Sequence, residues 1–266
     1  MKRNLVVLLA VAALAFVATG CNKLKARDNL NRGVQAFKST QYNQAVERFE
    51  QAVQLDPSFT PARLYLAMAY YMQYIPGAES PENQQMADHA LEQFQKVLAQ
   101  DQKNDVATKS IASLYFNEKK WDLAEQWYKK AIDLNPKDKE AYYTLGVITW
   151  FKWYPALGTA RAKLGMTPEA PGPIKDKKVK EELKTQYLPM VNDGIHNLEK
   201  ALEIDKEYDD AMAYMNLLIR ERADLDDSPE EYKKDIEVAD NWVQKTLATK
   251  KIKNERKPTS TGINAQ

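Results

Sequence analysis

Residues 111–136 read IASLYFNEKKWDLAEQWYKKAIDLNP, and this stretch decides the fold. Its apolar and small residues recur at helical spacings, which is the pattern of amphipathic helices rather than of strands. The pattern also returns elsewhere in the chain at an interval of 34 residues. Four residue pairs have this separation: Ile111 and Leu145, Ala112 and Gly146, Ala90 and Ala124, and Phe94 and Tyr128. A period of this length predicts consecutive helical hairpins that bury their apolar faces against their neighbours.

The same stretch resembles a tetratricopeptide repeat. Small residues stand where its two helices must approach closely, and aromatic residues stand where space is left. Asn135-Pro136 ends the second helix, because proline cannot continue it. The positions that carry the resemblance are Ile111, Ala112, Tyr115, Trp121, Ala124, Tyr128 and Ala131. The resemblance implies an all-α fold, a right-handed superhelix of about five tetratricopeptide hairpins. An unrelated helical bundle is the alternative interpretation.

Less regular copies of the repeat extend the array over residues 26–250. The first copy contains Gly33, Ala45 and Phe49, and a degenerate fifth copy begins near Asp209. The predicted units are about 26–59, 60–104, 105–138, 139–208 and 209–250. Units 2, 4 and 5 exceed the period, and we expect their additional residues between the two helices of each unit.

Start signals locate several helices. Thr60, Ser80 and Ser228 each precede a proline, which predicts a capping residue followed by a proline in the first helical turn. Ser228 and Glu231 also have the spacing of a capping box. The segments that start at Ser80 and Ser228 both begin Ser-Pro-Glu, and we interpret each as a second helix lengthened at its start.

The largest insertion covers about residues 154–190 and begins Tyr154-Pro155. Its part rich in proline and glycine, which includes Pro171-Gly172-Pro173, predicts an irregular loop. Its charged part, from Lys175 to Lys184, predicts a helix that leads into the second helix of unit 4.

Residues 1–20 predict a secretory signal peptide, since Lys2-Arg3 precedes a short apolar run. The run, 5–18, has 14 residues, whereas a membrane-spanning helix needs about 20. Cys21 is the only cysteine, and it follows Ala18-Thr19-Gly20 in a pattern that resembles a bacterial lipobox. The resemblance implies that Cys21 carries lipid, palmitate among its acyl chains, and that residues 21–25 form a short tether. An ordinary secreted protein or an uncleaved anchor are the alternatives.

The lipobox resemblance also implies a cellular location. A multiply acylated cysteine would hold a membrane firmly, since a single acyl chain binds only marginally. Asn22, in place of aspartate, resembles the lipoproteins that double-membrane bacteria sort to the outer membrane. We therefore expect a lipid-anchored protein of the bacterial cell envelope, on the outer membrane and facing the periplasm.

The first helices of tetratricopeptide units line a concave groove, and the resemblance assigns this groove to partner binding. It implies binding of other envelope proteins or their peptide segments. The predicted groove residues are Phe37, Met68, Tyr71, Lys109, Phe116, Tyr143, Trp150 and Arg220. Further aromatic residues stand around them, namely Tyr65, Tyr74, Phe151, Trp153 and Tyr154. An apolar surface of this size is typical of a binding site.

Three other functions remain open at this point. The insertion or the last helix would make a structural lipoprotein of the chain if either folded back and filled the groove. An apolar ligand could occupy the groove in place of a peptide. The basic and polar residues 251–266 predict a disordered tail, which could contact an anionic envelope polymer.

Residues typical of catalysis are sparse. His89 and His196 have no histidine or cysteine at metal-binding spacing, and nucleotide-binding and nucleophile motifs are absent. The acidic run 224–231 lacks the form of a calcium loop, and carboxylates are favoured at a helix start. We therefore expect a non-enzymatic protein without metal or cofactor. The net charge of +1 provides no general attraction to nucleic acid, and the sequence makes no prediction of oligomeric state.

Overall fold

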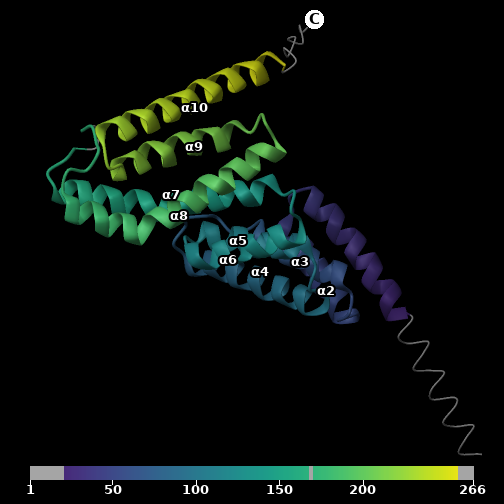
Figure 1. The fold of residues 1–266 in the computed structure, drawn as a ribbon. Helices are drawn as coiled ribbons and strands as arrows, with labels where there is room; N and C mark the ends of the chain where they lie inside the picture. The colour runs from purple at the N-terminus through teal and green to yellow at the C-terminus, as the bar shows by residue number, and fades with distance from the viewer. Residues whose placement is uncertain (1–20, 168–169, 257–266) are drawn as a thin grey trace, which may run out of the picture. The chain divides into compact units, whose positions relative to one another are not determined.

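The structure is a computed structural model that describes residues 21–167 and 170–256 (Figure 1). The described residues form helices joined by turns, and none of them is in a strand, which confirms the predicted all-α class. After a first helix over residues 21–38, the helices are α2 Tyr42–Leu55, α3 Thr60–Tyr71, α4 Pro81–Gln100, α5 Asp105–Asn117, α6 Trp121–Leu134, α7 Lys139–Lys163, α8 Lys177–Ile204, α9 Asp209–Arg222, the short 3₁₀ helix η1 Ala223–Leu225 and α10 Pro229–Glu255. In chain order they make five helix–turn–helix segments.

The second helices of these segments differ in length. α2 and α6 have 14 residues each, whereas α4 has 20 and α10 has 27. α4 and α10 each begin at the proline of a Ser-Pro-Glu sequence, so their additional residues lengthen the helix at its start.

Side-chain caps define where several helices begin. Ser80 accepts a hydrogen bond from the Asn83 backbone N–H, and Ser228 and Glu231 form the reciprocal capping box that their spacing predicts. Thr60 does not act as a cap, because α3 already includes it and its hydroxyl donates to Gln100 Oε1 at 2.7 Å. Further caps, at positions that sequence reasoning did not single out, are Asn104 for α5, Asp138 for α7 and Asp176 for α8.

The insertion differs from the prediction at its start. Pro155 lies inside α7 rather than at the beginning of a loop, although a proline in a helix interior costs about 3 kcal/mol. Trp153 and Leu157 flank it and are 0% and 4% exposed, so burial on both sides holds the helix together. The loop therefore begins only after Lys163, and the charged segment predicted from Lys175 is helical from Lys177 onward, as part of α8.

The two ends of the array are more helical than expected. Residues 21–25, expected as a tether, belong to the helix that runs to residue 38. Residues 251–255, expected at the start of a disordered tail, belong to α10. The predicted signal peptide 1–20 and the remaining tail 257–266 lie outside the described residues.

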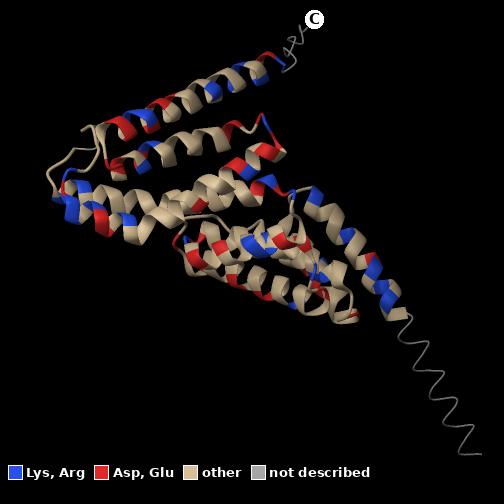
Figure 2. Cartoon of the chain, in the orientation of Figure 1, with Lys and Arg blue, Asp and Glu red and all other residues tan. Residues whose placement is uncertain are grey.

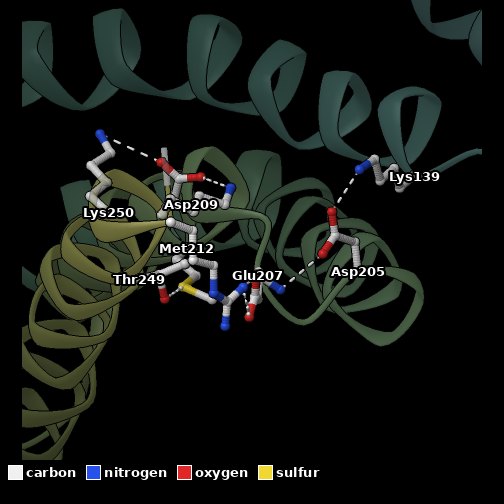
Figure 3. Close-up of polar contacts among 9 residues, drawn as sticks. Lys139, Asp205, Glu207, Asp209, Met212, Thr249 and Lys250 are labelled. Atoms are coloured by element: carbon white, nitrogen blue, oxygen red, sulfur yellow. Dashed lines mark hydrogen bonds and ion pairs between the residues drawn. The ribbon is translucent and has the colours of Figure 1, made fainter. Parts of the chain in front are cut away.

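Ion pairs explain why α10 continues into the basic segment. Lys253 pairs with Asp209, and Arg256 pairs with Glu207 at 2.7 Å. The two acids, labelled in Figure 3, lie at the start of α9 and in the turn before it. Acidic residues gather in the first turn of α10 and basic residues near its end (Figure 2), which matches the polarity of the helix dipole.

The chain divides into two compact units, Met1–Trp127 and Tyr128–Gln266. In the first, Phe49 and Phe94 are fully buried among alanines. A Cβ atom at Gly33 would lie 2.4 Å from the Phe49 ring, so the first helix can approach α2 this closely only at a glycine.

The second unit has one continuous core to which α7, α8, α9 and α10 all contribute. Trp153, Leu198, Met215 and Leu218 are among its large members and are at most 2% exposed. Among the described residues, no helix combines the length and the apolar character needed to cross a membrane.

Candidate partner-binding surfaces

In the first unit, Phe37 and Phe116 occupy equivalent positions near the ends of first helices. The ring centroids of Phe37 and Tyr42 are 5.4 Å apart, and those of Phe116 and Trp121 are also 5.4 Å apart, both edge-on. Both phenylalanines are half-buried. Each therefore packs on the first aromatic residue of the next helix and leaves only part of its ring at the surface.

Tyr71 joins α3 to α5. Its hydroxyl lies 2.7 Å from Ser113 Oγ and accepts a hydrogen bond from Asn117 Nδ2 at 3.2 Å. Lys109 and Phe116 lie one turn to either side of Ser113 on α5, so the spacing places them on the face that Tyr71 contacts. Met68, one turn before Tyr71, is half-buried and packs on the core of this unit. The structure thus brings four predicted groove residues together on α3 and α5: Met68, Tyr71, Lys109 and Phe116.

In the second unit, aromatic side chains of α7 and α9 form a continuous row. The Tyr143 ring lies 5.7 Å from that of Tyr214, which lies 5.8 Å from the ring of Trp150. Trp150 in turn stacks on Tyr154 at 5.0 Å. We call Tyr143, Tyr214, Trp150 and Tyr154 the aromatic row. Burial raises the pKa of Tyr143 and Tyr214, so both hydroxyls remain neutral in the physiological range.

Exposure is greatest at the Tyr154 end of this row. Tyr143 and Trp150 are half-buried, whereas Tyr154 is 49% exposed. Arg220 pairs with Asp240 of α10, and its Nε donates a hydrogen bond to Asn216 Oδ1 one turn earlier on α9. The guanidinium of Arg220 therefore already has anionic and polar partners within the unit.

Trp153 is not a surface residue. It is fully buried and packs against Tyr187 of α8, because α7 continues past it and places it in the core of the second unit. The connection between α7 and α8 folds onto the connection between α9 and α10, where the Ile174 N–H donates to the Asp224 carbonyl at 2.9 Å. This packing leaves Tyr154 exposed, so the insertion does not cover the whole row.

A cavity of about 500 Å³ opens beside Tyr154, within the second unit. Leu157, Met166 and Ile236 form apolar walls, from α7, from the loop after it and from α10. Among the described residues, the charged members of its wall are Arg161, Arg220, Glu221 and Asp224.

Arg161 and Asp224 form a buried ion pair in this wall. Arg161 also donates to the carbonyl oxygens of Thr167, at 2.9 Å, and Ala170. Burial raises the pKa of the Asp224 carboxyl, and the hydrogen bond and charge of Arg161 oppose that rise. Arg161 therefore connects Asp224 to the backbone at Thr167 and Ala170, and both members of the pair already have partners.

Glu221 has a different environment. Its Oε1 accepts a hydrogen bond from Trp150 Nε1 at 2.9 Å, whereas its Oε2 is enclosed without a hydrogen-bond partner among the described residues. Burial raises the pKa of Glu221 to about 7; the Trp150 hydrogen bond opposes this shift and the charge of Asp224 adds to it. Glu221 thus links the aromatic row to the cavity.

Sequence reasoning did not identify Arg161 or Glu221, and it assigned Asp224 only to a run at a helix start. Arg161 and Asp224 are 63 residues apart, so no local spacing connects them. The available signal for Glu221 was its position next to Arg220, a predicted groove residue. Among the described residues, no group of histidine, cysteine, aspartate and glutamate is arranged to hold a metal ion.

Two protein-family models match separate stretches of the chain, and both describe a repeat. A family model for the TPR repeat matches residues 112–150, and a model for the tetratricopeptide repeat matches residues 30–74. No curated protein sequence matches the chain.

Solved structures of other proteins share the arrangement of helices. A crystal structure of MamA has 16% sequence identity and a TM-score of 0.56, over 88% of this chain and 96% of that chain. MamA from Desulfovibrio magneticus RS-1 has 14% identity and a TM-score of 0.56, over 85% and 96% of the two chains. YrrB, described as a TPR protein with an unusual peptide-binding site, has 16% identity and a TM-score of 0.54, over 89% and 97%.

At these identities the likeness to solved structures concerns the fold alone. The family models add the repeat itself, in two separate stretches of the chain. The chain therefore contains tetratricopeptide repeats and has the all-α fold of tetratricopeptide-repeat proteins.

Proposed function

We propose that this protein is a non-catalytic scaffold that binds segments of other proteins, with the aromatic row of the second unit as a principal contact surface. The observation that carries the proposal is the exposure of Tyr154 at the end of a row of packed aromatic rings. Rings that are already held by their neighbours offer a large contact area at little entropic cost.

The comparisons support this proposal at the level of fold. Repeats of this class build surfaces for other proteins, and one solved structure of the same fold is described as having a peptide-binding site. In the first unit, the half-buried residues on α3 and α5 would form a second contact surface of the scaffold.

We further propose that Cys21 anchors the scaffold by lipid in the bacterial cell envelope, on the periplasmic side of the outer membrane. The lipobox-like sequence before Cys21 supports this assignment, and the side chain is exposed at the first described position. Replacing Cys21 by serine should abolish incorporation of labelled palmitate and move the protein from the membrane fraction to the soluble fraction. Retention in the membrane fraction without labelling would contradict the anchor.

Partner binding is tested by crosslinking and pull-down from native membranes, with Tyr154→Ala compared to wild type. Leu247→Ala is the matched control, since Leu247 is a 57% exposed apolar residue of the same unit, on α10. We expect Tyr154→Ala to lose a defined set of partner proteins with an unchanged melting temperature, whereas the control retains them. Identical partner sets for both variants would show that the row does not bind.

A further inference from the structure

Among the described residues, the wall of the cavity beside the aromatic row carries two acids, Glu221 and Asp224, and two bases, Arg161 and Arg220. Arg161 pairs with Asp224, and Arg220 pairs with Asp240, which lies outside the wall. Glu221 is therefore the acid of this wall that forms no ion pair with a described residue.

The lack of a cation is important because the Glu221 carboxylate is enclosed. One carboxylate oxygen receives the Trp150 indole N–H, and the other is enclosed without a partner among the described residues. Removing a carboxylate from water without a compensating cation or hydrogen bond is costly. The raised pKa of Glu221 is the expected response of such a group.

We propose that this cavity receives a basic side chain, arginine or lysine, from the bound segment of a partner protein. The inference rests on the proposed function and specifies the chemistry of the segment. The charged head would lie near Glu221, and the aliphatic stem would lie along Leu157, Met166 and Ile236. The exposed Tyr154 ring at the entrance adds a face for a cation.

Charge complementarity selects this occupant over the alternatives. An acidic side chain would meet Glu221 and Asp224, and neither arginine is free to receive it. A neutral apolar side chain would fill space but leave Glu221 uncompensated. The volume, about 500 Å³, exceeds that of one side chain, so apolar neighbours of the basic residue would complete the filling.

The test uses two blocked peptides, acetyl-Leu-Arg-Leu-amide and its isosteric neutral counterpart with citrulline in place of arginine. The purified protein carries nitrogen-15 in its tryptophans, and the Trp150 indole resonance, assigned with Trp150→Phe, reports binding because this N–H contacts Glu221. At pH 8 we expect the arginine peptide to bind about tenfold more tightly than the citrulline peptide, which is the size of a one-unit coupling.

Lowering the pH to 6 should remove most of that preference, since Glu221, with a pKa of about 7, becomes largely protonated. Among the described residues, the ionisable and charged groups around it are Tyr154 and Arg161 of α7, Arg220 of α9, Asp224 of η1, and Tyr232 and Asp240 of α10. Glu221→Gln should bind both peptides equally at both pH values, because it keeps the shape of the wall and removes its charge.

A second variant blocks the cavity without touching the acid. Gly158 lines the cavity, and a Cβ added there meets no atom within 4 Å, so Gly158→Leu should fold normally and weaken both peptides. Equal binding of the two peptides by wild type, or a charge preference that survives in Glu221→Gln, would overturn the inference. The peptide experiment uses purified protein and no natural partner. Its failure can therefore be told apart from failure of the Tyr154→Ala pull-down, which tests the proposed function.

Discussion

Two glycines of α7 have opposite surroundings: one is closely packed, and the other faces open space. A Cβ at Gly146 would lie 2.5 Å from Leu198 Cγ, in the core between α7 and α8. A Cβ at Gly158 would meet nothing within 4 Å. We therefore expect Gly146→Ala to lower the free energy of unfolding by about 1–3 kcal/mol through overpacking. Gly158→Ala should raise it by up to about 1 kcal/mol through helix propensity.

Urea denaturation of the two glycine variants measures both effects. Because the same substitution is made twice in one helix, differences in the unfolded chain largely cancel. Equal destabilisation by both variants would contradict the close approach of α8 at Gly146.

Glu221 should make stability depend on pH. Its pKa is about 7 in the folded protein and 4.5 in the unfolded reference, so the folded state binds the proton more tightly. Its contribution to stability is therefore complete at low pH and is lost as the pH rises through about 7. Relative to wild type, Glu221→Gln should gain about 2 kcal/mol between pH 5.5 and pH 8, since each pKa unit corresponds to about 1.4 kcal/mol.

The comparison with the glutamine variant isolates this one group. Asp224 and Asp226 also have raised pKa values, but they are present in both proteins and largely cancel. Thermal unfolding at several pH values gives the difference. A difference that stays constant with pH would mean that Glu221 keeps its ordinary pKa.

At the scale of elements, the end of α10 shows why a basic segment need not be a tail. Lys253 pairs with Asp209. Burial raises the pKa of the Asp209 carboxyl, but the hydrogen bond from Lys253, a backbone hydrogen bond and the charges of Lys253 and Lys250 together lower it below its ordinary value. Figure 3 shows Asp209 beside Lys250. Replacing Lys253 by methionine keeps the aliphatic stem and removes the charge. We expect faster amide exchange over the last turns of α10, with a global loss below about 1 kcal/mol, because the lysine is partly exposed.

Lys251→Met is the matched control for that experiment, since Lys251 is exposed and two positions away on α10. It should leave amide exchange in the last turns unchanged. Equal exchange in both variants would indicate that helix propensity, rather than the ion pair, holds this end.

Features that depend on residues close in sequence, or at a fixed interval, could be predicted from the sequence. Features that depend on contacts between distant segments could not. The repeat period and the Ser228 capping box depend on residues close in sequence or at a fixed interval, and both predicted helical structure correctly. The continuation of α7 through Pro155 depends on the burial of Trp153 and Leu157 against distant helices, which no local pattern contains. The ion pair of Arg161 with Asp224 is equally non-local, so the charged wall of the cavity could not be predicted.

At the scale of the whole molecule, the core of Tyr128–Gln266 predicts how much chain is needed for folding. Its apolar cluster combines Trp153 of α7, Leu198 of α8, Met215 of α9 and Ala239 of α10, so no pair of these helices buries its apolar face alone. We expect residues 128–256 expressed alone to unfold in one cooperative transition. Residues 128–208 should lack that transition and bind a hydrophobic dye, because the faces that cover α8 are missing. Cooperative unfolding of the shorter fragment, followed by circular dichroism, would show that the fourth hairpin does not need the fifth.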